Sequence, residues 1–170
     1  MLLIGYLLKR TTVPGGWSIA SLVSELCSVS TCLAPAPEDW VKHFSYNDLG
    51  FFKTCADALS VLPRQASDFS LFAYRLLPLR FSEDRVEPFE IVAEGVEPLA
   101  ASFVSLGFDV INRTVPPFFE CSPLSCNGMA DEVPVNRFCL LATLDEAIAF
   151  AQRCAREEPE PGPLVLRGTA

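Results

Sequence analysis

Histidine is nearly absent from this 170-residue chain, and the motifs of several common enzyme classes are missing altogether. The single histidine, His43, is the only base that a cysteine–histidine dyad could use. The chain has no Gly-x-Gly-x-x-Gly, Gly-Lys-Ser/Thr, Gly-x-Ser-x-Gly or His-Glu-x-x-His motif. We therefore expect no phosphate-binding loop, no serine-hydrolase elbow and no zinc-protease helix.

Positive charge is also scarce. Thirteen Lys and Arg residues face 21 Asp and Glu residues, which gives a formal net charge of −8. A negative protein repels phosphate backbones, and no cluster of basic residues reverses this locally. The composition therefore excludes nucleic acid as an expected partner.

No apolar run is long enough for a membrane helix. The apolar start, "MLLIGYLL", ends at Lys9, whereas a spanning helix needs about 20 residues. It has no basic leader and no small-x-small cleavage site, so it predicts a buried first strand. We expect a cytoplasmic protein without a membrane partner, in which the seven cysteines stay reduced.

Apolar residues are plentiful. They make up 50% of the chain, which includes 13 Phe, and this composition excludes disorder. A chain of this length can bury about 70% of its unfolded surface. We predict one globular domain over residues 1–170, with no cofactor needed for folding.

Helix and strand signals alternate along the chain. Thr54 predicts the N-cap of a helix that stops at Pro63, and Thr143 predicts a second N-cap, with Glu146 as its capping-box partner. Further helices are predicted over 97–107 and Trp17–Leu26. Strands are predicted over Leu2–Leu8, Leu49–Phe52, Phe69–Arg80, Val86–Ala93, 108–114, Phe138–Ala142 and Gly162–Gly168.

This order predicts an α/β or α+β fold with a mixed sheet of about six strands and helices packed on it. Residues 49–114 would form a ferredoxin-like βαββαβ unit, with strand–helix extensions on either side. The segments "FFKTCADALSV" and "LLATLDEAIAF" also share the pattern apolar-apolar-x-Thr-x-x-x-Ala-(Leu/Ile). They are either an internal repeat or two unrelated Thr-capped helices that follow apolar runs.

Two irregular stretches each carry a cysteine pair of the form Cys-Ser-x-x-(Ser/Thr)-Cys. Cys27 and Cys32 lie in one, and Cys121 and Cys126 lie in a predicted long Cys/Pro-rich loop over 114–136. Long loops in compact domains are often functional. These pairs are therefore the main candidate site.

Three interpretations of the pairs remain open. Four thiolates could hold zinc, although four residues intervene in each pair, whereas zinc knuckles usually place their ligands two to four positions apart in sequence. Cys121 or Cys126 could instead be a catalytic or redox-active thiol with His43 as its base, although Glu120 should raise the thiol pKa. Alternatively the cysteines are small buried residues, as we expect for Cys55, Cys139 and Cys154, and the loop serines bond their own backbone.

We expect Cys121 and Cys126 to lie close together, with Cys27 and Cys32 elsewhere. The favoured function is a non-catalytic interaction module for an unknown protein or small-molecule partner. A thiol-dependent or metal-supported enzyme or redox sensor is the alternative. The candidate binding residues are Trp40, Phe118, Phe119, Asn127 and Arg137. The segment from Glu83 to Glu97, with six acidic residues and one Arg, predicts a solvated face or a docking patch for a basic partner.

Overall fold

The computed structural model describes residues 1–13, 22–25, 27, 51–62, 69–83, 85–113, 120–126, 129–157 and 164–170. At five of these positions it describes the backbone alone: Arg113, Glu120, Cys121, Cys126 and Arg167.

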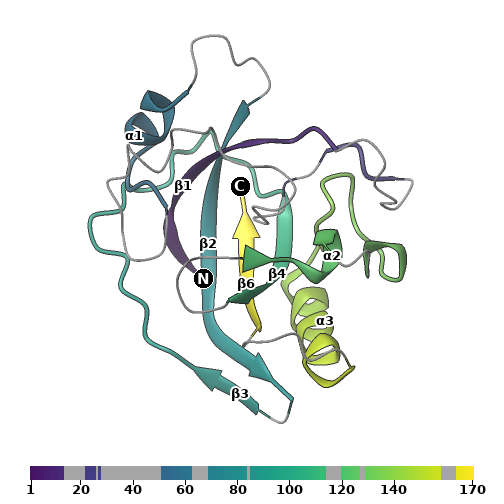
Figure 1. Ribbon diagram of the computed structural model, residues 1–170. Helices are drawn as coiled ribbons and strands as arrows, with labels where there is room; N and C mark the ends of the chain where they lie inside the picture. The colour runs from purple at the N-terminus through teal and green to yellow at the C-terminus, as the bar shows by residue number, and fades with distance from the viewer. Residues whose placement is uncertain are drawn as a thin grey trace.

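The fold is built on one six-stranded sheet (Figure 1). Its strands are β1 (Leu2–Arg10), β2 (Phe69–Ser82), β3 (Arg85–Pro88), β4 (Gly107–Arg113), β5 (Glu120–Cys121) and β6 (Leu164–Thr169). The order is β1-β2-β6-β4-β5, and β3 pairs with the far end of β2. Every pairing between the described strands is antiparallel.

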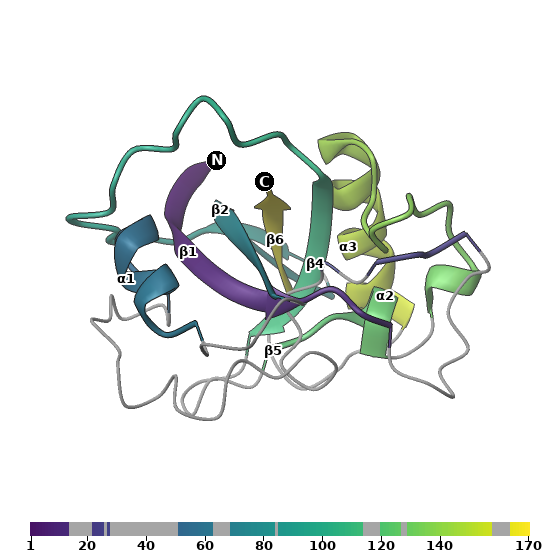
Figure 2. The same ribbon diagram turned by 90° about the horizontal axis from the view of Figure 1, so that it is seen from above.

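The helices flank this sheet. They are α1 (Cys55–Ser60), α2 (Pro123–Cys126) and α3 (Leu144–Glu157), with a 3₁₀ turn, η2, at Met129–Asp131. Helix α1 lies beside β1, whereas α3 lies beside β4 at the other end of the sheet (Figure 2). One helix therefore lies near each end of the sheet, α1 beside β1 and α3 beside β4.

Both predicted N-caps are confirmed. Thr54 Oγ1 accepts a hydrogen bond from the Asp57 amide at 3.0 Å. Thr143 Oγ1 accepts one from the Glu146 amide at 3.2 Å, and Glu146 Oε2 accepts one from the Thr143 amide at 2.9 Å, which completes the capping box. These caps satisfy amides that the first turn of a helix leaves unpaired.

The predicted helix over 97–107 is wrong. The chain there makes one isolated turn, in which the Phe103 amide bonds the Ala100 carbonyl at 3.1 Å. The carbonyls of Glu97 and Pro98 accept hydrogen bonds from the Tyr6 hydroxyl. Those carbonyls would be the acceptors of the next helical turn, so the contact with β1 competes with the helix.

The strand predictions are confirmed for β1, β2, β4 and β6, whereas β3 ends at Pro88 and falls short of the predicted range. In the two predicted strands that precede the capped helices, the described residues form only isolated bridges. These bridges join Tyr6 to Phe52 and Phe108 to Leu141. The described part of the predicted helix Trp17–Leu26, residues 22–25, contains a turn and no helix.

The fold class is therefore α+β. The prediction of about six strands is confirmed, but the mixed sheet is wrong because all described pairings are antiparallel. The βαββαβ unit is not shown, since its second helix would have been residues 97–107. Within the predicted loop 114–136, the described residues contain β5, α2 and η2.

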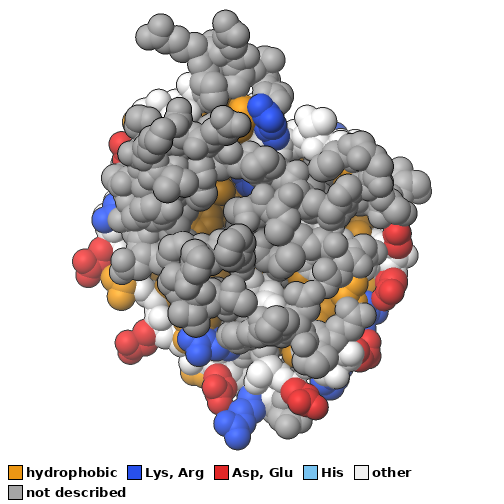
Figure 3. All heavy atoms as spheres, in the orientation of Figure 1, with side chains coloured by type: hydrophobic (Ala, Val, Ile, Leu, Met, Phe, Trp, Pro, Cys, Tyr) orange, Lys and Arg blue, Asp and Glu red, His pale blue; other side chains and the backbone are white. Residues whose placement is uncertain are grey.

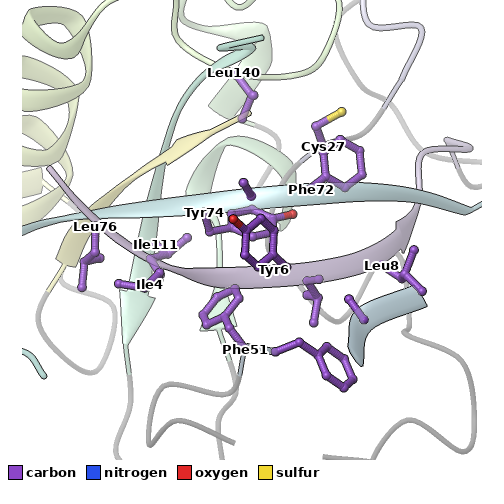
Figure 4. Packing of buried hydrophobic residues seen from close by; sticks show 14 of the residues in the cluster. Ile4, Tyr6, Leu8, Cys27, Phe51, Phe72, Tyr74, Leu76, Ile111 and Leu140 are labelled. Atoms are coloured by element: carbon purple, nitrogen blue, oxygen red, sulfur yellow. The ribbon is translucent and has the colours of Figure 1, made fainter. Parts of the chain in front are cut away.

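The buried side chains form two clusters. The first joins residues of β1 and β2, such as Ile4 and Leu76, with Ile111 of β4 and Leu140 (Figure 4). The second packs the buried face of α3, including Phe150, against the sheet and against Phe81 of β2. Each cluster therefore uses residues from both the first and the second half of the chain.

Candidate functional site

Most of the predicted site residues lie outside the described part of the chain. These are Cys32, Trp40, His43, Phe118, Phe119 and Asn127. The dyad with His43 and the aromatic anchors therefore stay predictions.

The second cysteine pair is described by its backbone. Cys121 ends β5 and pairs with Asn112 of β4, and Cys126 ends the single turn of α2. The structure describes the side chain of neither residue. The predicted proximity of Cys121 and Cys126, the catalytic or redox-active thiol and the zinc site all stay predictions.

The serine inside this pair has an unexpected partner. The Ser122 hydroxyl donates a hydrogen bond to Asp109 Oδ1 at 2.6 Å, and neither residue is exposed to solvent. We expected the loop serines to bond their own backbone, but Ser122 instead ties the loop to β4. A carboxylate buried this deeply needs hydrogen-bond donors, and the loop supplies one.

The first cysteine pair is described at Cys27. Its amide donates to the Phe138 carbonyl at 3.2 Å, and its side chain is fully buried. Burial, aided by nearby Glu25, raises the pKa of the Cys27 thiol to about 12, although Lys9 and Arg137 oppose the shift. Cys27 is therefore a neutral thiol at physiological pH and a poor nucleophile.

Arg137, a predicted binding residue, lies in the segment that Cys27 contacts. Its carbonyl accepts hydrogen bonds from the Ser24 and Glu25 amides. Its exposed guanidinium lies 4.6 Å from the centre of the Phe138 ring. The structure thus brings together two of the predicted residues, Cys27 and Arg137.

The other described thiols agree in part with the prediction of small buried residues. Cys139 and Cys154 are buried, and Cys154 Sγ lies 3.9 Å from Met129 Sδ. Cys55 is only half-buried, at the start of α1. Burial, with a further contribution from Glu97, raises the pKa of the Cys55 thiol as well.

Among the side chains that the structure describes, no three His, Cys, Asp or Glu residues are grouped closely enough to hold a metal ion. The four-cysteine zinc site is not tested by this result, because three of its side chains are not described. In the same described residues, no helix has the length and apolar character needed to span a bilayer.

Sequence reasoning recognised the acidic composition of 83–97 but not the form of the segment that follows β3. Residues 89–106, which we call the strap, leave β3 and run along one side of the molecule to β4 (Figure 2). The strap has no regular structure, yet six apolar residues hold it against the first core cluster: Phe89, Ile91, Val96, Leu99, Phe103 and Leu106.

Glu97 fastens the strap to the sheet and to α1. Its amide donates to the Lys53 carbonyl at 2.8 Å, and its Oε2 accepts from the Cys55 amide at 3.0 Å. The Tyr6 hydroxyl donates to its carbonyl at 2.9 Å. A carboxylate at the first turn of α1 also complements the positive end of the helix dipole.

An open apolar depression of about 310 Å³ lies between the strap and β2. Its lining residues are Leu71, Phe72, Ser102, Phe103, Val104, Leu106 and Ala170. Val104 is 71% exposed, whereas Phe103 packs against the Tyr6 ring with centroids 5.9 Å apart. The depression thus adjoins the side chain that bonds the Glu97 carbonyl.

No protein-family model, no curated protein and no solved structure matches this chain.

Proposed function

We propose that the chain is a non-catalytic interaction module that binds a basic segment of a partner protein along the strap. One observation carries the proposal: the exposed Val104 lines an apolar depression in a strap that also presents carboxylates. Val92 on the same strap is exposed as well, and exposed apolar side chains rimmed by polar residues are a feature of binding surfaces.

The charge of the strap supports a basic partner. Glu90, Glu94 and Glu97 are all exposed, whereas two basic side chains reach the strap among the described residues, Lys53 near Gly95 and Arg80 over the Phe89 ring. In Figure 3 the described acidic side chains lie around the margin of the face shown. With a net charge of −8, the whole molecule would attract a basic segment and speed its association.

The depression supports an apolar anchor within that segment. Its volume, about 310 Å³, is at the small end of ligand pockets and suits one side chain of a partner. Residues that fill such pockets contribute most of the binding energy at an interface. The proposed partner segment therefore combines Lys or Arg residues with one large apolar side chain.

The described thiols support a non-catalytic role. A cysteine nucleophile needs a lowered pKa, yet the pKa values of the Cys27 and Cys55 thiols are both raised by burial. The thiol-dependent or metal-supported alternative rests on Cys32, Cys121 and Cys126, whose side chains lie outside the described part of the chain.

Site-specific photo-cross-linking in cells that produce the full chain tests this proposal. A photoreactive residue would replace Val104 in one variant and Leu59, which is 48% exposed on α1, in a control variant. We expect Val104 alone to cross-link a partner, and mass spectrometry to place the cross-link on an apolar residue flanked by Lys or Arg.

The charge requirement is tested in the same experiment. Glu90→Lys with Glu94→Lys should abolish the cross-link from Val104, whereas Glu157→Lys on α3 should not. The proposal is wrong if Val104 captures nothing beyond what Leu59 captures, or if the cross-link survives the charge reversal.

A further inference from the structure

We infer that the chain is an internal duplication: two copies of a strand–loop–turn–helix–strand unit, related by a two-fold axis through the centre of the sheet. The first copy runs from β1 to β2 and the second from β4 to β6. The inference does not depend on the proposed function.

The sequence signature of the unit is longer than the pattern noted above. Residues 47–61, "NDLGFFKTCADALSV", align without gaps with residues 136–150, "NRFCLLATLDEAIAF". The aligned pairs include Asn47 with Asn136, Gly50 with Cys139, Thr54 with Thr143, Asp57 with Glu146 and Ala58 with Ala147. In each copy the sequence motif Cys-Ser-x-x-(Ser/Thr)-Cys lies between the first strand and this segment.

The alignment of Gly50 with Cys139 has a physical basis. Cys139 has a φ of +59°, a left-handed conformation that glycine adopts most readily. Asn136 organises the same turn, because its Oδ1 accepts hydrogen bonds from the Phe138 and Leu140 amides and its Nδ2 donates to the Leu106 carbonyl. The aligned residues thus include those that shape the turn.

The contact between this segment and the first strand is the same in both copies. Tyr6 and Phe52 exchange two backbone hydrogen bonds of 2.9 Å, and so do Phe108 and Leu141. Tyr6 and Phe108 are each preceded by a glycine with positive φ, +140° at Gly5 and +144° at Gly107.

Each of these glycines packs against the backbone of the residue that its neighbour bridges, Phe52 for Gly5 and Leu141 for Gly107. A Cβ at Gly5 would lie 2.5 Å from the Phe52 carbonyl oxygen, and a Cβ at Gly107 would lie 2.6 Å from that of Leu141. Two unrelated strand–helix units have no reason to share this arrangement as well as the threonine cap.

The strand pairing identifies the axis. Tyr74 pairs with Gly5 in the first copy, Thr169 pairs with Gly107 in the second, and Tyr74 and Thr169 pair with each other. Exchange of the two copies therefore maps the Tyr74–Thr169 pair onto itself. Ala73 and Ala170, the next pair along, exchange hydrogen bonds of 2.7 and 2.9 Å.

The duplication changes how the cysteine motif is understood. In both motifs the described hydrogen bonds hold the chain in place. The Cys27 amide donates to the Phe138 carbonyl of the other copy, and the Ser122 hydroxyl donates to Asp109. The shared Cys-Ser-x-x-(Ser/Thr)-Cys pattern is then explained as common descent of one loop. It does not require a ligand shared by the two loops.

A graft within the full chain tests the inference. Residues 47–61 would be replaced by the sequence of residues 136–150, and in a control by that of residues 135–149, which shifts the register by one. We expect the aligned graft to keep a single cooperative thermal transition and a dispersed amide spectrum, and the shifted graft to lose both. An aligned graft that melts as low as the shifted one overturns the inference.

Single substitutions provide a test that does not depend on tolerance of a graft. Asn47→Ala should lower the melting temperature about as much as Asn136→Ala, whereas Asp48→Ala, which aligns with the exposed Arg137, should lower it little. If the melting temperature of Asn47→Ala instead equals that of Asp48→Ala, this result would also count against the duplication.

Discussion

Two glycines are required where the backbone of another segment lies against a strand. At Gly5 and Gly107 a side chain would meet a carbonyl oxygen, and the positive φ is itself unfavourable for other residues. Gly95 in the strap also has a positive φ, of +75°, but a Cβ there would be no closer than 3.6 Å to its neighbours. A side chain therefore has room at Gly95 but not at Gly5 or Gly107.

Alanine at Gly5 or at Gly107 should each destabilise the fold by about 3 kcal/mol, from backbone strain and steric overlap together. Gly95→Ala should cost about 1 kcal/mol, because only the conformational term applies. Urea unfolding followed by circular dichroism measures all three. Equal losses at the three positions would contradict the geometry.

Tyr6 should make stability depend on pH in alkaline solution. Burial, with smaller contributions from Cys55 and Glu97, raises its pKa from 10.0 to about 12. A raised pKa means that the folded state keeps the proton longer than the unfolded state. The resulting stability is present below pH 10 and is lost as the pH rises to about 12.

We therefore expect Tyr6→Phe to flatten the loss of unfolding free energy between about pH 10 and pH 12. Some loss should remain, because the pKa of Cys27 is also about 12 in the folded protein, against 9.0 for an ordinary thiol. Parallel stability–pH curves for the wild type and Tyr6→Phe would show that Tyr6 ionises equally in both states.

The elements that sequence reasoning found are those whose signals are local. Thr54 and Thr143 cap the helices that they precede, so three or four neighbouring residues contain the whole signal. The segment 97–107 has equally helical spacing, but Tyr6, 91 residues away, bonds its first carbonyl. No pattern within the segment reveals that competitor.

The same distinction applies to the candidate site. The Cys-Ser-x-x-(Ser/Thr)-Cys pattern directs attention to Ser122, but the hydrogen-bond partner of Ser122 is 13 residues away on β4. The depression depends on how the strap lies across β2, which composition alone cannot give. Sequence reasoning therefore identified the acidic segment without its apolar neighbour.

Ser122→Ala should destabilise the fold by about 2 kcal/mol, because a buried carboxylate loses a donor. The exposed Ser102 provides the control, and Ser102→Ala should change the unfolding free energy by less than about 0.5 kcal/mol. Chemical denaturation measures both. A neutral Ser122→Ala would mean that the 2.6 Å hydrogen bond does not hold the loop on β4.

Asn136 should be more sensitive than an ordinary turn residue. Asn136→Ala removes two acceptor contacts and one donor contact, and we expect a loss of about 2 to 3 kcal/mol. Asn136→Asp keeps the acceptor oxygen but lacks the donor to the Leu106 carbonyl, so its loss should be smaller. If both variants are equally unstable, the donor contact alone accounts for the effect.

At the scale of the whole molecule, the two copies of the unit are not two domains. The central strands β2 and β6 pair with each other, and the first core cluster combines Ile4 and Tyr74 with Ile111 and Val165. The first cluster is therefore shared between the copies, whereas the second lies in the second copy except for Phe81 of β2 among its buried residues. This arrangement also explains why the strand order could not be predicted, since sequential pairing would have placed β4 beside β3, whereas β4 pairs with β6.

The chain should therefore unfold in one cooperative transition despite its internal repeat. We expect the loss of helix, followed by far-UV circular dichroism, to coincide with the loss of amide protection in β1 and in β4. Separate midpoints for the two copies would mean that their cores are independent.

The strap has no counterpart, because the segment between the two copies occurs only once. Substitutions in the repeated turn, cap or strand positions disturb backbone contacts on which the sheet depends, so selection should hold them nearly fixed. In the strap, Glu90, Val92, Glu94 and Val104 all point outward. Natural variants should therefore differ most there, and a change of partner during evolution would leave the paired units unaltered.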